Sequence, residues 1–209
     1  MRIEKISLGH LDNNCYIVTD ERAKISALID VGDANQQLFV AIKDLKIDTI
    51  LLTHCHYDHS MGAQSIKDIT GAKIAIHKND AAGLADPDIN MSCAFGRRKF
   101  SLTPDILLND GDEIEIGSLK VKVIHTPGHT SGSICFKLEQ TLFTGDTLFS
   151  QSIGRVDFPT GSAEEMKSSV NILKSLDGNL NILPGHGEPS ALDIERETNP
   201  YMTSSFELL

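Results

Sequence analysis

The sequence of 209 residues contains no tryptophan, and aromatic residues make up only 5% of it. It has no run of about 18 apolar residues, the length that a membrane-spanning helix requires. Its first residues, MRIEKISLGH, are charged and polar, unlike a signal peptide. Its four cysteines include no Cys-x-x-Cys pair. We therefore expect a cytoplasmic protein with reduced cysteines, no membrane association and a mainly aliphatic core.

Basic residues are fewer than acidic ones. The chain has 19 Lys and Arg against 29 Asp and Glu, a formal net charge of −10. Because phosphate binding requires clustered Lys and Arg, we expect no general affinity for nucleic acid or for an anionic membrane. The one basic cluster, Arg97-Arg98-Lys99, is short, and we interpret it as a solvated loop rather than a contact with an acidic substrate group. The expected partner is a small molecule, and composition leaves the oligomeric state open.

Strand and helix patterns follow one another along the chain. Alternating or apolar runs predict strands at 2–8, 14–20, 24–33, 47–53 and 72–78, and later within 112–130, 132–146 and 180–186. Helical periodicity predicts helices at 34–46, 61–71, 162–176 and 190–199. Residues 83–112 carry neither pattern, and a loop of that length is usually functional or mobile. Because no repeat or linker interrupts residues 1–209, we expect a single domain with layers of sheet and helix.

The segment THCHYDH, residues 53–59, concentrates three histidines and an aspartate at the end of a predicted strand. Side chains alternate along extended backbone, so His54 and His56 can face the same point. Asp58 and His59 follow where the chain turns into a helix. Imidazole and carboxylate groups are suitable ligands for zinc and related divalent metals. The segment therefore predicts a metal site at this strand end.

Three further donors recur later, each beside glycine at the end of a predicted strand. They are His129 in TPGHTSG, Asp146 in FTGDT and His186 in LPGHG. Glycine lets the backbone approach a shared centre closely, and strand ends are where α/β proteins commonly bind ligands. We predict that all seven groups converge on metal ions at one rim of the sheets. The remaining histidines are interpreted as satisfied, solvated or supporting residues: His10, His77 and His125.

These segments resemble the metallo-β-lactamase superfamily in its glyoxalase II-like form. The resemblance rests on T-H-x-H-x-D-H-x-x-G at 53–62 and, in order, on TPGHTSGS, LFTGDTLFSQSIGRVDFPTGS and LPGHGEPSALDIERETNPY. It covers nearly the whole chain and implies an αββα sandwich, with the metal site in a cleft along the open edge of two sheets. It also implies a division of the donors that spacing alone does not give: His54, His56 and His129 at one metal, Asp58, His59 and His186 at the second, and Asp146 bridging both.

Two metals held in this way imply a hydrolase. They would lower the pKa of a shared water, and the resulting bridging hydroxide would attack a carbonyl whose oxygen is bound by a metal. Asp58 would orient the hydroxide and accept its proton. A thioester suits this site, because a thiolate leaves without a strong general acid, and S-2-hydroxyacyl-thiols are the expected substrates. Zinc is the first choice of cation for this donor set, with iron or manganese as alternatives.

Two features distinguish the chain from glyoxalase II itself. That enzyme carries a C-terminal helical extension that helps bind glutathione, whereas this chain ends at residue 209, shortly after His186. Phe136 and Phe158 stand where glyoxalase II is expected to place tyrosines near the thiol peptide. The chain is therefore similar to the short single-domain hydrolases of bacteria and archaea, and glutathione is left open as the thiol. Met91 and Phe95 could contact substrate instead, although a plain surface loop is the preferred interpretation.

Three other functions stay open. A mononuclear-iron persulfide dioxygenase uses the same scaffold with part of the ligand set, and the segment SIGRVDFPTGS favours the hydrolase branch over it. A lactonase or β-lactamase is a neighbouring hydrolase, and lactonases usually carry aspartate where this chain has His56. A binding module without catalysis is disfavoured because every ligand position is filled.

Overall fold

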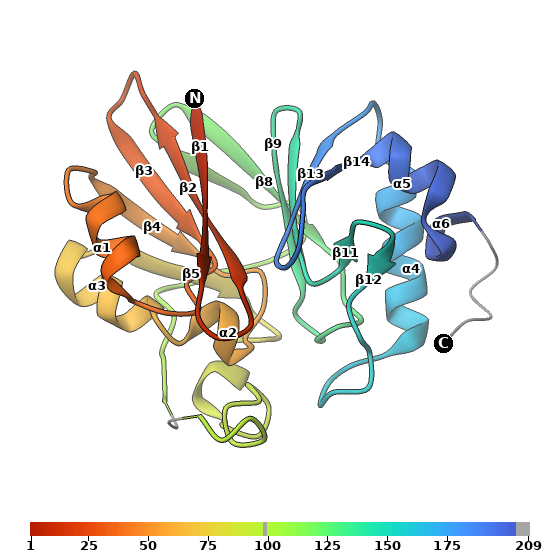
Figure 1. Cartoon of the computed structure of the whole chain (residues 1–209), viewed down its shortest axis with the longest axis horizontal. Helices are drawn as coiled ribbons and strands as arrows, with labels where there is room; N and C mark the ends of the chain where they lie inside the picture. The colour runs from red at the N-terminus through yellow and green to blue at the C-terminus, as the bar shows by residue number, and fades with distance from the viewer. Residues whose placement is uncertain (98–99, 204–209) are drawn as a thin grey trace.

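The computed structural model describes residues 1–97 and 100–203, so Arg98 and Lys99 of the predicted basic cluster lie outside the described residues. Two six-stranded sheets face each other, and helices cover the outer face of each (Figure 1). This is the αββα sandwich that the resemblance implies. Across the described residues, no helix has both the length and the hydrophobicity needed to cross a bilayer.

The first sheet is built from the N-terminal half of the chain. Its strands lie in chain order: β1 (Arg2–Leu8), β2 (Asn13–Asp20), β3 (Ile25–Ile29), β4 (Ile47–Leu51), β5 (Lys73–His77) and β6 (Ile106–Leu108). β1, β2 and β3 pair antiparallel, whereas β3, β4, β5 and β6 pair parallel. The parallel crossovers carry three helices: α1 (Gln36–Ile42), α2 (Tyr57–Ser60) and α3 (Ala63–Thr70). Because parallel strands end at the same edge, the segments after β3 and β4 meet there.

The second sheet is built from the C-terminal half. Its strands lie in the order β14 (Ser190–Ala191), β13 (Asn181–Pro184), β10 (Thr141–Gly145), β9 (Ile134–Leu138), β8 (Leu119–His125) and β7 (Glu113–Ile116). A small ribbon, β11 (Leu148–Phe149) and β12 (Ser152–Ile153), follows β10. The outer helices are α4 (Ala163–Lys174), α5 (Leu192–Thr198) and α6 (Pro200–Thr203). β10 and β13 pair parallel, so they too end at one edge.

The core between the two sheets is mainly aliphatic, as the composition predicts. Phe136 and Phe143 are the largest fully buried side chains in it. The placement of Phe136 beside the thiol of a substrate is therefore wrong, because this ring points into the inter-sheet core. Two further clusters lie under α1 and α3 on one side and under α4 and α5 on the other.

Helix ends follow the local signals that the sequence carries. Ser162 precedes α4, and its hydroxyl accepts a hydrogen bond from the amide of Glu165 at 3.3 Å. α3 ends at Gly71, whose φ of 73° is left-handed. The predicted strand 24–33 is too long, because Asp30 turns the chain with a φ of 55°.

The prediction that 83–112 is wholly irregular is also wrong in part. This segment contains a 3-10 helix, Gly83–Ala85, and the strand β6, which pairs with the edge of β5. Three residues are too few for a periodic pattern, so only the neighbouring strand reveals β6.

The carboxylate of Asp20 joins turns of the two facing sheets. Its oxygens accept hydrogen bonds from the Ser118 hydroxyl at 2.6 Å and amide at 2.7 Å, and from the amides of Arg22 and Ala23. Gly117 precedes Ser118 with a φ of 63°, and a Cβ at Gly117 would lie 2.6 Å from this carboxylate. These hydrogen bonds hold the pKa of Asp20 below its usual range, and the bond from the Ser118 hydroxyl has the largest effect.

We expect Asp20→Asn to lower the melting temperature near neutral pH and to matter progressively less in acid. A pKa that is lower in the folded state stabilises the fold above the unfolded-state pKa of about 3.9, and this stabilisation is lost as the pH falls toward the folded-state value. Thermal unfolding of the variant and the parent, followed from neutral pH into acid, measures the difference. A difference that stays constant below about pH 4 would contradict this role.

Candidate metal centre

The first four donors lie on the chain segment that leaves β4. His54 and His56 follow the strand, and their rings stand edge to face with centroids 4.8 Å apart. Asp58 and His59 lie in α2, the short helix that opens directly after His56. The Ser60 hydroxyl donates to the carbonyl oxygens of Cys55 and His56 at 3.0 and 2.8 Å, which fixes this turn. The segment thus presents four donors to one edge of the sheet.

The other three donors arrive from the second sheet. His129 follows β8, Asp146 follows β10 and His186 follows β13. Nε2 of His129 lies 2.9 Å from Nδ1 of His56, and Nε2 of His186 lies 3.1 Å from Nε2 of His59. All seven predicted donors therefore meet between the two sheets, although they come from four separate segments.

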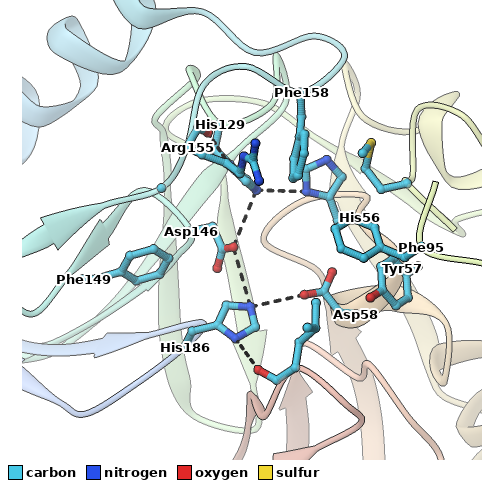
Figure 2. Close-up of a pocket in the computed structure, with 13 residues that line it drawn as sticks. His56, Tyr57, Asp58, Phe95, His129, Asp146, Phe149, Arg155, Phe158 and His186 are labelled. Atoms are coloured by element: carbon cyan, nitrogen blue, oxygen red, sulfur yellow. Dashed lines mark hydrogen bonds and ion pairs between the residues drawn. The ribbon is translucent and has the colours of Figure 1, made fainter. Parts of the chain in front are cut away.

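The donors form two triads with an aspartate between them. Ligand atoms lie within 4.8 Å of one another in each of three groups: His54, His56 and His129; Asp58, His59 and His186; and His54, His59 and Asp146. One oxygen of Asp146 lies 3.4 Å from Nε2 of His59. The other lies 3.6 Å from Nε2 of His129 (Figure 2). This geometry fits a dinuclear centre in which Asp146 serves both halves.

Hydrogen bonds outside the centre orient the imidazoles. Nδ1 of His129 bonds to the carbonyl oxygen of Arg155 at 2.7 Å, and Nδ1 of His186 bonds to that of Leu11 at 3.0 Å. Nδ1 of His59 faces Asp30, and Nδ1 of His54 faces Thr53. Each of these contacts leaves Nε2 free to face the centre, the arrangement typical of metal-binding histidines.

The donor atoms that face the centre suit a pair of divalent cations. Nε2 of His54 and Oδ1 of Asp146 are buried, and neither has a hydrogen-bond partner among the described residues. The facing nitrogens of His56 and His129 form a hydrogen bond if one of them carries a proton, whereas a cation between them would use the lone pairs of both. Imidazole and carboxylate donors match zinc and iron. The residues therefore fit two metal ions.

The two halves of the centre differ electrostatically. Burial, reinforced by neighbouring histidines, lowers the pKa of His54 and of His56, so both are neutral donors at neutral pH. Burial also disfavours the charged form of His59, but the carboxylates of Asp146, Asp30 and Asp58 outweigh it and raise the pKa of His59 to about 10. For Asp58, burial is outweighed by His59 and His186, which hold its pKa below the usual range. The half that contains Asp58 and His59 is thus rich in negative charge and attracts cations.

Two buried carboxylates that the sequence analysis missed brace the donors. Asp30 accepts from the amide and hydroxyl of Thr53 at 2.8 and 2.7 Å, and its Oδ2 lies 2.9 Å from Nδ1 of His59. Asn13 approaches the same nitrogen at 3.1 Å. The sequence did carry one sign of this role. Asp30 directly follows an apolar run, as several of the seven predicted donors do.

Asp80 braces the other half. One of its oxygens accepts from the Cys55 amide at 2.9 Å and from the Thr130 hydroxyl at 2.7 Å, and the other accepts from the Gly132 amide at 2.7 Å. It thereby joins the backbone between His54 and His56 to the loop that carries His129. Burial raises the pKa of Asp80. Nothing in the local sequence around Asp80 indicates these contacts, because its partners lie far away along the chain.

The remaining histidines stay outside the triads, as predicted. His10 is exposed. His77 and His125 stack on each other with ring centroids 4.1 Å apart. Cys55 is fully buried between its two histidine neighbours in sequence, in agreement with a structural role.

A pocket of about 320 Å³ opens beside the centre. Asp58, Asp146, Phe95 and Phe158 line it (Figure 2). Met91 is a further lining residue. Met91 is buried, so it is not a plain surface residue, whereas Phe95 is 45% exposed; both line this pocket, and their contact with substrate stays a prediction. Phe158 lies near the donors, with its ring centroid 5.7 Å from that of His56.

An αββα sandwich with a binuclear, histidine-rich site at its open edge defines a class of metal-dependent hydrolases. The chain belongs to the metallo-beta-lactamase superfamily, whose family model matches residues 8–186. That match includes all seven donors.

Individual relatives cover the chain almost completely. A protein of Haemophilus influenzae named hydroxyacylglutathione hydrolase GloC is 32% identical, over 98% of this chain and 99% of its own. The crystal structure of BLEG-1 B3 metallo-beta-lactamase superposes with a TM-score of 0.91 at 31% identity, covering 97% of this chain and all of that one. TTHA1623 in a di-iron-bound form gives a TM-score of 0.84 at 29% identity, covering 95% and 99%.

Proposed function

We propose that this metallo-hydrolase cleaves thioesters, with S-2-hydroxyacyl-thiols as the model substrates, and that it does so with two divalent cations. The observation that carries the proposal is the convergence of seven donors into two triads that share Asp146. The name of the Haemophilus influenzae relative supports the choice of a thioester. Complete donor sets of this kind are typical of catalysis rather than of simple binding, because both halves open on a pocket.

Each triad would hold one cation: His54, His56 and His129 the first, and Asp58, His59 and His186 the second, with Asp146 shared. When bound, two cations supply an activated water and an electrophile for a carbonyl oxygen. Zinc is the proposed ion because tetrahedral imidazole and carboxylate sites favour it. The di-iron form of TTHA1623 makes iron the first alternative.

Asp58 is the proposed proton acceptor. Its side chain is 15% exposed, faces the pocket and lies 3.2 Å from Nε2 of His186. Because its pKa is held below the usual range, the carboxylate is ionised at neutral pH and can orient a water. Its position beside the pocket makes it the residue that would take the proton of that water. The carbonyl of Arg155 keeps the His129 ring in place while the reaction proceeds. A thiolate leaving group needs no strong acid, so a thioester makes the smallest demand on these residues.

Hydrolysis of a β-lactam is a second candidate, because the similarity to BLEG-1 extends over the whole chain. A persulfide dioxygenase with one iron is a third, on the basis of the shared scaffold. The seven donors favour two cations over one, and so they favour the hydrolases over the dioxygenase.

Metal content and a substrate panel test the proposal together. Protein isolated without added metal should contain about two zinc or iron ions per chain, as the two triads require. The panel contains lactoyl and acetyl thioesters of several thiols, a β-lactam, a lactone and a persulfide with oxygen uptake as the readout. Metal-dependent release of thiol from the thioesters is the expected result. One iron per chain together with oxygen uptake would replace the proposal by the dioxygenase, and cleavage of the β-lactam alone would replace it by the lactamase.

A further inference from the structure

The pocket beside the metal centre has an apolar wall assembled from distant parts of the chain. Leu11 comes from the β1–β2 loop, Phe95 from the segment before β6, Phe149 from β11 and Phe158 from the segment before α4. In Figure 2 the three phenylalanine rings stand around the donors His56, His129 and His186. Single exposed apolar residues are common on proteins, but a convergent set around a polar centre indicates an apolar ligand.

The wall is accessible and ordered at the same time. Leu11 and Phe95 are 43% and 45% exposed, and Phe149 and Phe158 are partly buried. The ring of Tyr57 packs against that of Phe95 with centroids 5.6 Å apart, and Phe95 meets Phe158 edge to face at 6.2 Å. Such contacts hold aromatic rings in place. A ligand that buries these apolar surfaces therefore does not also have to restrict the motion of the rings.

Apart from the cations that the centre would hold, the described residues of the pocket offer an anionic, peptide-like group no unpaired basic side chain. Among the described residues that line it, the only lysine or arginine is Arg155. Its guanidinium group donates to both carboxylate oxygens of Asp157, at 2.7 and 2.6 Å, and stacks 3.9 Å above the Phe158 ring. The charge of Arg155 is thus already paired, and its planar face extends the apolar wall.

We infer that the substrate carries an apolar group, of about the size of a benzyl or short alkyl chain, beside the bond that is cleaved. Phe95, Phe149 and Phe158 would be the residues that select this group. The inference rests on the thioesterase function proposed above and narrows it to a substrate class. A volume of about 320 Å³ lies at the small end of the range of ligand pockets, so it has room for one such group together with the thioester itself. The group belongs either to the acyl chain or to the thiol.

Two series of thioesters separate these sources. In the first, acetyl to hexanoyl groups are esterified to one small thiol; in the second, one lactoyl group is joined to methyl, butyl and benzyl thiols and to glutathione. The metal-loaded protein should show a kcat/KM that rises by up to about fourfold for each buried methylene in at least one series, until the pocket is full. The glutathione thioester should be a poorer substrate than the benzyl thioester.

Matched variants assign the effect to the wall. Phe158→Ala and Phe95→Ala should flatten the dependence on chain length, whereas Phe158→Leu should retain most of it because leucine preserves the apolar surface. Ile69→Ala is the control, since Ile69 is 67% exposed on α3 and outside this pocket. Calorimetric binding of thioether analogues, which cannot be cleaved, gives the same comparison without catalysis. Their affinity should rise with chain length in the parent and less steeply in Phe158→Ala.

The outcomes separate this inference from the function on which it rests. A kcat/KM that rises with chain length in the parent, and rises less steeply in the alanine variants, supports both the apolar selection and the thioesterase function. Thioesters that are cleaved equally well at every chain length, or only as glutathione adducts, overturn the apolar selection and leave the thioesterase intact. If no thioester is cleaved by protein that contains two metal ions, the proposed function fails and the inference fails with it.

Discussion

Removal of the metal ions will abolish hydrolysis and lower the melting temperature. Activity should fall by at least roughly a hundredfold, because the cations supply both the nucleophile and the charge stabilisation of the reaction. Stability should fall as well, because four buried histidines and three partly buried donors lose the cations that they share. A ligand present at about 100 to 1,000 times its Kd contributes about 3–4 kcal/mol. For a domain of this size that corresponds to a melting temperature lower by about 5–15 °C.

Dialysis against a chelator, followed by activity assays, metal analysis and thermal unfolding, measures these effects. Zinc, iron and manganese added back separately should restore both activity and melting temperature, and their order identifies the best cation. Protein treated with the metal-saturated chelator controls for effects of the chelator itself. Full activity in protein shown to contain less than about a tenth of an equivalent of metal would contradict a metal-dependent hydrolase.

Gly185→Ala should damage the metal centre although residue 185 donates no ligand. A Cβ at Gly185 would lie 2.3 Å from Oδ1 of Asp146 and 2.6 Å from Cε1 of His59. Neither atom can withdraw freely, because the Asp146 carboxylate stands between the two triads and the His59 ring is held by Asp30. A displacement of about 1 Å in such a site can cost a hundredfold in rate. We therefore expect kcat/KM to fall by about two orders of magnitude, together with a lower metal content.

Gly187 provides a matched control on the other side of His186. Nothing lies within 4 Å of a Cβ built there, but the backbone has a φ of 76°. Gly187→Ala should therefore cost about 1 kcal/mol of stability through backbone strain, while metal content and activity stay near those of the parent. Steady-state kinetics, metal analysis and thermal unfolding of both variants make the comparison. Equal activity in Gly185→Ala and the parent would show that Asp146 and His59 move to accommodate the Cβ without loss of function, and it would contradict a rigid metal centre.

The donors themselves were predictable because their signals are local. Each donor segment stands at the end of an apolar run and beside glycine or in a dense histidine motif, and parallel strands deliver such ends to one edge. The prediction that the seven side chains converge is confirmed by their positions. Their assignment as ligands, and of Asp58 as the proton acceptor, stays a prediction until the metal is measured.

The supporting residues were not predictable from local pattern. Asp80 joins the segments of Cys55 and Thr130, and Asp30 reaches His59, through contacts between residues far apart in sequence. Phe136 and Phe158 have the same side-chain chemistry, yet one fills the inter-sheet core and the other faces the pocket. Alternation along a strand tells which residues share a face, but it does not tell whether that face meets another sheet or a cleft.

The sequence by itself determined the class of fold, the positions of most strands and helices, and the seven groups able to hold metal. The helices, strands and donors follow from periodicity, turn residues and donor chemistry, all of which act within a few residues. The αββα sandwich was implied by the resemblance of the motifs to a known family. The division of the donors into two triads around Asp146 was implied by the family resemblance, and the structure brings the same groups together. Only the tertiary structure decided which carboxylates brace them and which aromatic rings surround the pocket. Those features depend on how two sheets from opposite halves of the chain pack together, and no local stretch of sequence carries that information.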